Sequence, residues 1–141
     1  MVHLLAVIVW VGGMAFAHFA LRPALAETLE PPQRLKLLGA ILQRFFAAVT
    51  SAIVLIMVSG GYLMAKIGSA VPVPVHVMLV IGVVMMLIFA YLRLRTYPKL
   101  RAAIADSRWP DAGGAASTVR HLVAVNLGLG VVVVIAAVLG R

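Results

Sequence analysis

The first twenty-one residues carry no charged side chain, and this apolar run restricts the fold more than any other feature of the chain. A helix rises about 1.5 Å per residue, so such a run is long enough to cross the hydrocarbon core of a bilayer. The order Ala24-Leu25-Ala26 also has the form of a signal-peptide cleavage site. However, a basic segment at its start is missing, and the run is longer than the apolar part of a signal peptide. We therefore expect a membrane-spanning helix over residues 2–21.

Three further apolar runs follow, at about 45–65, 76–94 and 121–139. Hydrophobic residues make up 64% of the chain and charged residues 11%, a composition that excludes a soluble globular domain. Cysteine is absent, which excludes disulfides and thiolate metal sites. We expect one transmembrane domain over residues 1–141, an all-α four-helix bundle with up-down-up-down topology. Before the last run, residues 98–107 have the pattern of a short helix with proline in its first turn.

Basic residues lie almost entirely in the first and third connections between these runs. Ten of the twelve are there, namely Arg22, Arg34, Lys36, Arg44, Arg93, Arg95, Lys99, Arg101, Arg108 and Arg120. The other side has Lys66 and Arg141. Because positively charged loops stay in the cytoplasm, both termini are expected outside, in a multi-pass protein of the bacterial inner (cytoplasmic) membrane. Topology and attraction to the anionic lipid of the bilayer thereby explain the net charge of +8, so nucleic-acid binding is excluded.

The four histidines lie near the ends of the apolar runs. His3 and His18 are fifteen residues apart in the first run, which separates them by roughly 22 Å along a helix. Their directions around that helix differ by only about 60°. His76 opens the third run and shares the outer level with His3, whereas His121 opens the fourth run and shares the inner level with His18.

Two histidine pairs at two depths could bind two b haems, one in each half of the membrane, and so form a path for electrons across it. An imidazole inside a membrane segment is costly without a partner, and bundles bind haem iron between histidines on facing helices. We expect one or two b haems, with Trp10 packed against a macrocycle and Arg22 and Arg120 near the inner propionates. The protein would then transfer electrons through the membrane, as a carrier or an oxidoreductase, between a donor and an acceptor that the sequence does not identify.

Other interpretations stay open on the same residues. Histidines at helix ends can simply bind lipid headgroups or carbonyls. Copper is an alternative cargo, since Cu(I) suits imidazole and thioether ligands, with Met78 as an alternative ligand. A structural membrane protein without cofactor is a further alternative, and the chain could form a homo-oligomer. No acid–base dyad, nucleophile or phosphate-binding loop is apparent in the sequence, so hydrolytic chemistry is not expected.

Small and polar residues mark two further places. Ser59-Gly60-Gly61 forms a notch near the end of the second run, either for close helix packing or for a planar ligand. Asn126 in the fourth run is expected to make a hydrogen bond between helices.

Three stretches carry a resemblance to a known family, namely HLLAVIVWVGGMAFAHFALRPAL, VHVMLVIGVVMMLIFAYL and VRHLVAVNLGLG. They resemble the small bacterial membrane proteins of the CopD-like copper-resistance family. More distantly, the arrangement is similar to HemJ-type protoporphyrinogen oxidases, which are four-helix membrane proteins that bind b haem. The first resemblance implies copper handling at the inner membrane. The second carries the relatives' first-helix histidine onto His3, while the lysine of their third helix falls on Met78.

Overall fold

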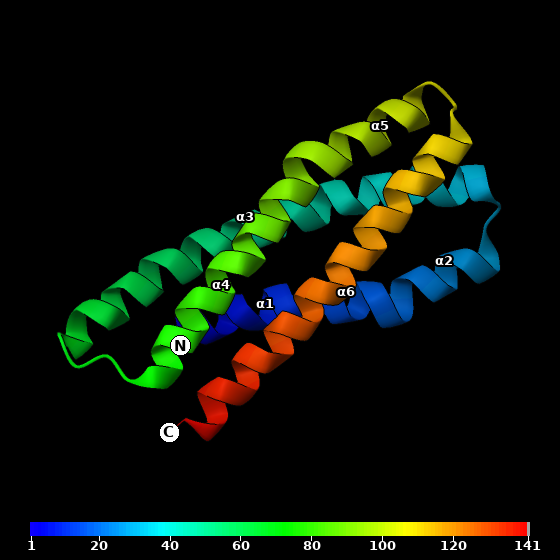
Figure 1. The fold of residues 1–141 in the computed structure, drawn as a ribbon. Coiled ribbons are helices and arrows are strands. Elements are labelled where there is room, and N and C mark those ends of the chain that lie inside the picture. The colour runs from blue at the N-terminus through cyan, green and yellow to red at the C-terminus, as the bar shows by residue number, and fades with distance from the viewer. Residues whose placement is uncertain (141) are drawn as a thin grey trace.

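The computed structural model describes residues 1–140, and the chain is helical along nearly all of this length (Figure 1). It forms four long rods joined by short links. The first rod is α1 (Val2–Phe16), η1 (Ala17–Leu21) and α2 (Arg22–Thr28); the second is α3 (Pro31–Ile67); the third is α4 (Val73–Tyr91), η2 (Leu92–Thr96) and α5 (Tyr97–Ala105); the fourth is α6 (Trp109–Leu139). Within the described residues, all four rods are long and apolar enough to span a membrane. The predicted all-α membrane bundle is confirmed.

The rods pack in an order that differs from their order along the chain. In the described residues α1 packs mainly along α3 and, less extensively, along α6, whereas α4 packs mainly along α6. The α5 helix contacts both α6 and α3. The N-terminus, the α3–α4 link and the end of α6 lie together at what we call the termini end (Figure 1). The α2–α3 and α5–α6 links lie at the opposite end, which we call the basic end.

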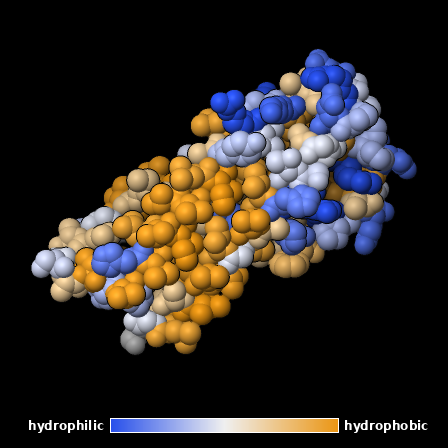
Figure 2. Space-filling model, viewed as in Figure 1, coloured by the Kyte–Doolittle hydropathy of each residue, from blue (hydrophilic) through white to orange (hydrophobic). Residues whose placement is uncertain are grey.

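The surface follows this division between the two ends. Figure 2 shows apolar side chains over the half of the molecule that includes the termini end, and hydrophilic side chains gathered at the basic end. The ten basic residues that the sequence assigned to the cytoplasmic connections lie in α2, η2, α5, the α5–α6 link, the first part of α3 and the first part of α6. One half of the bundle therefore has the surface of a lipid-embedded protein, and the other half has a surface suited to water.

The helix expected at residues 98–107 is not a separate element. It begins at Tyr97 as α5 and continues directly from α4 through η2, which is a turn of π-helix. A proline ring clashes with the carbonyl four residues earlier in an α-helix, and for Pro98 that carbonyl belongs to Leu94 in η2. The same relation joins Pro23 to Phe19 in η1. In both rods the wider π turn lets the helix continue through a proline.

Aromatic rings form the centre of the bundle. The ring of Phe46, which is 1% exposed, meets Phe89 edge-on at a centroid distance of 5.6 Å and Tyr97 at 5.3 Å. Trp10 also meets Phe89 edge-on, at a centroid distance of 6.4 Å. These four rings join α1, α3, α4 and α5, and they fix the relative position of the rods.

Close contacts between helices depend on small residues and one amide. A Cβ on Gly130 of α6 would come within 2.9 Å of a methyl of Val11 on α1, so only glycine lets these two helices approach so closely. Asn126 donates its amide hydrogen to the carbonyl of Met85, at 3.4 Å, which joins α6 to α4. This is the interhelical bond expected from the sequence.

Candidate functional site

His3 lies in the first turn of α1, and α3 holds its ring in place. Its Nδ1 is 3.0 Å from the hydroxyl oxygen of Ser59. A Cβ on Gly60 would lie 3.3 Å from the Cε1 of His3, so the absence of a side chain there makes room for the ring. The small-residue notch of α3 is therefore the seat of the first histidine.

The hydrogen bonds of Ser59 favour one tautomer of His3. The Ser59 hydroxyl lies within hydrogen-bond reach of the carbonyl of Leu55, one turn earlier in α3. When the hydroxyl donates to that carbonyl, it accepts from His3, whose Nδ1 then carries the proton. The lone pair of Nε2 is then free. Metal-binding histidines commonly have this arrangement, with one nitrogen hydrogen-bonded to an oxygen and the other facing the ion.

His76 lies in the first turn of α4, with its side chain exposed. Its Nδ1 is 3.2 Å from the carbonyl oxygen of Pro72, which as an acceptor fixes the same tautomer. His3 and His76 are thus at the termini end, as expected from the topology. However, His3 binds to α3, and α4 packs mainly along α6, so the structure does not show the two rings facing each other.

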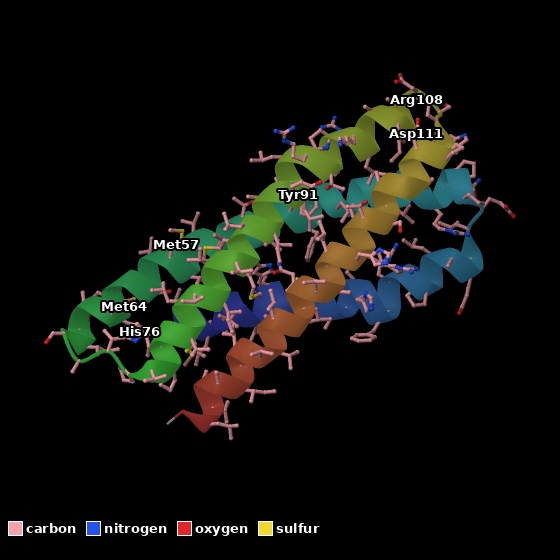
Figure 3. The ribbon with its side chains drawn as sticks, viewed as in Figure 1. Met57, Met64, His76, Tyr91, Arg108 and Asp111 are labelled. Carbon is pink, nitrogen blue, oxygen red and sulfur yellow. The ribbon has the colours of Figure 1, made fainter. Side chains whose placement is uncertain are left out.

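Methionines are present at the same end of the bundle. Met1 is exposed at the start of the chain, Met64 lies in the last turns of α3, and Met78 is half-buried near the start of α4. Figure 3 shows Met64 and His76 toward the α3–α4 link, far from Arg108 and Asp111 at the opposite end. Thioether and imidazole groups from three helices therefore gather at the termini end.

His18 and His121 lie near the basic end but line different cavities. His18, in η1, stands edge-on against Phe19 and lines a cavity of about 690 Å³ together with Arg22 and Arg120. His121 is exposed, donates from Nδ1 to the carbonyl of Ser117 at 2.8 Å, and lines an open groove of about 650 Å³ between α4 and α6. Because consecutive helical residues differ by about 100° in direction, Arg120 faces the first cavity while His121 faces away from it.

The remaining candidates are placed as follows. Arg22 and Arg120 lie close to His18, as the sequence suggested for them. Trp10 is in the aromatic core, with Phe89 as its ring partner. Among residues 1–140, no group of three or more histidines and carboxylates could hold a metal ion.

Two residues of these sites were not identified from the sequence. Ser59 holds His3, although the sequence indicated only a notch at this place. Arg34 lines the cavity of His18, with its guanidinium tied to the carbonyl of Leu29 at 3.2 Å. The sequence did indicate that Ser59 could meet His3. The end of the second apolar run, which contains Ser59, is at the same membrane level as the start of the first run, which contains His3.

A comparison with known families identifies the chain. The profile of the family described as copper resistance protein D matches residues 39–139, which is well over half of the chain and includes most of α3 and all of α4, α5 and α6. The first rod, with His3 and His18, lies outside the matched segment. No curated protein and no solved structure was found to match. The similarity to haem-binding oxidases has no support in these findings. The chain belongs to the copper resistance protein D family.

Proposed function

We propose that this membrane protein handles copper, and that it binds the ion as Cu(I), its cargo, at the termini end of the bundle. Two things support the proposal: the family is named for copper resistance, and the geometry of His3 suits a metal ligand. The observation that carries it is the chain of hydrogen bonds from His3 through Ser59 to Leu55. These hydrogen bonds leave the Nε2 lone pair of the half-buried His3 ring available at the membrane boundary.

The neighbouring side chains suit Cu(I) better than other ions. Cu(I) prefers soft thioether and imidazole ligands, whereas harder ions prefer carboxylate oxygens. The four acids of the chain, Glu27, Glu30, Asp106 and Asp111, are all in or beside the links of the basic end. Met64 and Met78 have flexible side chains that can adapt to an ion held by His3 or His76. Ligands drawn from α1, α3 and α4 would also couple copper binding to the packing of these helices.

Copper is preferred to haem because of the same geometry. A bis-histidine haem at the inner level needs His18 and His121 at one site, and these residues line two separate cavities. At the outer level, a bis-histidine haem needs the rings of His3 and His76 to face each other, and the structure does not show this arrangement.

A competition titration tests the proposal. The purified chain in detergent is titrated with Cu(I) against a coloured Cu(I) chelator, and we expect at least one bound ion per chain. His3→Ala and Met78→Leu should each weaken binding about tenfold or more, since each removes a soft ligand. His121→Ala is the matched control, because this histidine lies at the opposite end and should leave the affinity unchanged.

Three outcomes would contradict copper binding at this end. Equal loss of affinity in His3→Ala and His121→Ala would show that the copper bound is not localised to the termini end. An absorption band of haem in the purified protein, with no Cu(I) bound, would favour the electron-transfer hypothesis. Failure to bind either would favour a structural membrane protein without cofactor.

A further inference from the structure

The cavity beside His18 has a charge that the chain itself does not neutralise. Its walls come from η1, α2, the start of α3 and the first half of α6, and they include three arginines, Arg22, Arg34 and Arg120. Neither Asp nor Glu is among the described residues that line it. The ion pairs in residues 1–140 both belong to Arg108, with Asp106 and Asp111. Arg22 and Arg120 are also close enough for their like charges to repel each other.

Polar atoms in this cavity also lack partners. The Nδ1 of His18 and the Nε of Arg34 are buried, and neither has a hydrogen-bond partner within residues 1–140. Such atoms are rare in folded proteins, because burying a polar group without a partner costs free energy. Arg34 is nevertheless held in place, since its Nη2 donates to the carbonyls of Leu29 and Ala26 at 3.2 and 3.4 Å. The guanidinium is therefore fixed in position while its buried Nε donor lacks a partner.

Part of the lining of the cavity is apolar. Leu25, Leu35 and Leu38 line it, and each is 7% exposed. The elements that form the cavity meet near the basic end, beyond the apolar half of the molecule (Figures 1 and 2). A ligand that fills this space must combine an anionic group with a hydrocarbon part, and it must be found at the membrane surface.

We propose that this cavity, formed by Arg22, Arg34, Arg120 and His18, is a binding site for the phosphate group of an anionic phospholipid. Three guanidiniums around a phosphate give charge-assisted, forked hydrogen bonds, which are the strongest of their kind. The positively charged side of a membrane protein faces the leaflet rich in anionic lipid, and basic pockets between helices at that level bind such headgroups. The acyl chains would leave the cavity past the leucines toward the apolar half of the bundle.

The test compares variants that lose equal charge. The full chain is placed in nanodiscs of phosphatidylcholine with a small fraction of phosphatidylglycerol, and native mass spectrometry counts the phosphatidylglycerol that it retains. Arg34→Gln with Arg120→Gln should lower the affinity for phosphatidylglycerol at least about tenfold. The matched control is Arg95→Gln with Lys99→Gln, two exposed residues of the basic end outside the cavity, which should retain it.

A single variant distinguishes loss of lipid binding from a failure to fold. Arg120 is exposed, so Arg120→Gln should leave the thermal unfolding temperature unchanged and still weaken phosphatidylglycerol binding several-fold. Full retention of the lipid by a folded Arg120→Gln variant would overturn the proposal.

Three other results would also overturn it. Equal loss in both double variants would show general attraction to the basic end instead of a site. Inorganic phosphate that binds the protein as tightly as phosphatidylglycerol and displaces it would identify free phosphate as the ligand. A haem absorption band that disappears in Arg34→Gln with Arg120→Gln would assign the cavity to haem propionates.

Discussion

The hydroxyl of Ser59 has two hydrogen-bond partners. One is the backbone carbonyl of Leu55 in its own helix, and the other is the ring of His3 on α1, which the hydroxyl orients. Removing the hydroxyl should leave the Nδ1 of His3 without its acceptor, so the ring can rotate or change tautomer. Loss of a partner behind a metal-binding histidine typically weakens metal affinity about 10- to 100-fold. We therefore expect Ser59→Ala to weaken Cu(I) binding by that factor in the same chelator titration.

The control for this prediction is a second serine of the same helix. Ser51 donates to the carbonyl of Ala47 at 3.1 Å, in the same way that Ser59 donates to Leu55, but it is exposed and bonded only within its own helix. Ser51→Ala should therefore leave Cu(I) affinity unchanged, and Ser59→Thr should restore most of what Ser59→Ala loses. If Ser51→Ala and Ser59→Ala had equal effects, the role assigned to His3 would be wrong.

At the level of helices, Gly130 controls the distance between α1 and α6. A side chain at this place would meet the methyl groups of Val11 and the end of Met85. We expect Gly130→Leu to force the helices apart and to lower the free energy of unfolding by about 1–3 kcal/mol. Thermal unfolding in detergent, followed by circular dichroism, measures the change.

Gly128 gives the matched comparison, because it lies two residues earlier on the same helix with open space around the position of its Cβ. Gly128→Leu should leave stability unchanged or raise it slightly, since glycine is a poor helix former. A loss of equal size in the two variants would mean that glycine itself, and not the close approach of α1, sets the stability of α6.

The helices themselves could be predicted from the sequence, because an apolar run of about 20 residues has few alternatives to a membrane helix. The π turns could not, since they depend on how a helix accommodates Pro23 and Pro98 without breaking. The sequence also could not predict which face of α6 carries His121. One helical position separates it from Arg120, and only the packing of α6 decides which of the two faces the cavity.

For the molecule as a whole, the distribution of basic residues predicts its orientation in the membrane. A reporter enzyme that is active only outside the cytoplasm should be active when fused after Ile67 or at the C-terminus. The same reporter should be inactive when fused after Ser107, in the link between α5 and α6. The comparison of the three fusions measures topology directly, and activity after Ser107 would invert the assignment of both ends.

The length of α3 has a further consequence. Its 37 residues make a rod of about 55 Å, whereas the hydrocarbon core of a bilayer is about 30 Å thick. We therefore expect the part of the bundle around Leu38 and Leu100 to lie outside the hydrocarbon core, where the hydrophobic effect drives burial. We expect the part around Val11 and Gly130 to lie in lipid, where close packing replaces that effect. Urea, which acts through water, should thus loosen the first part while the second part of the same helices stays folded.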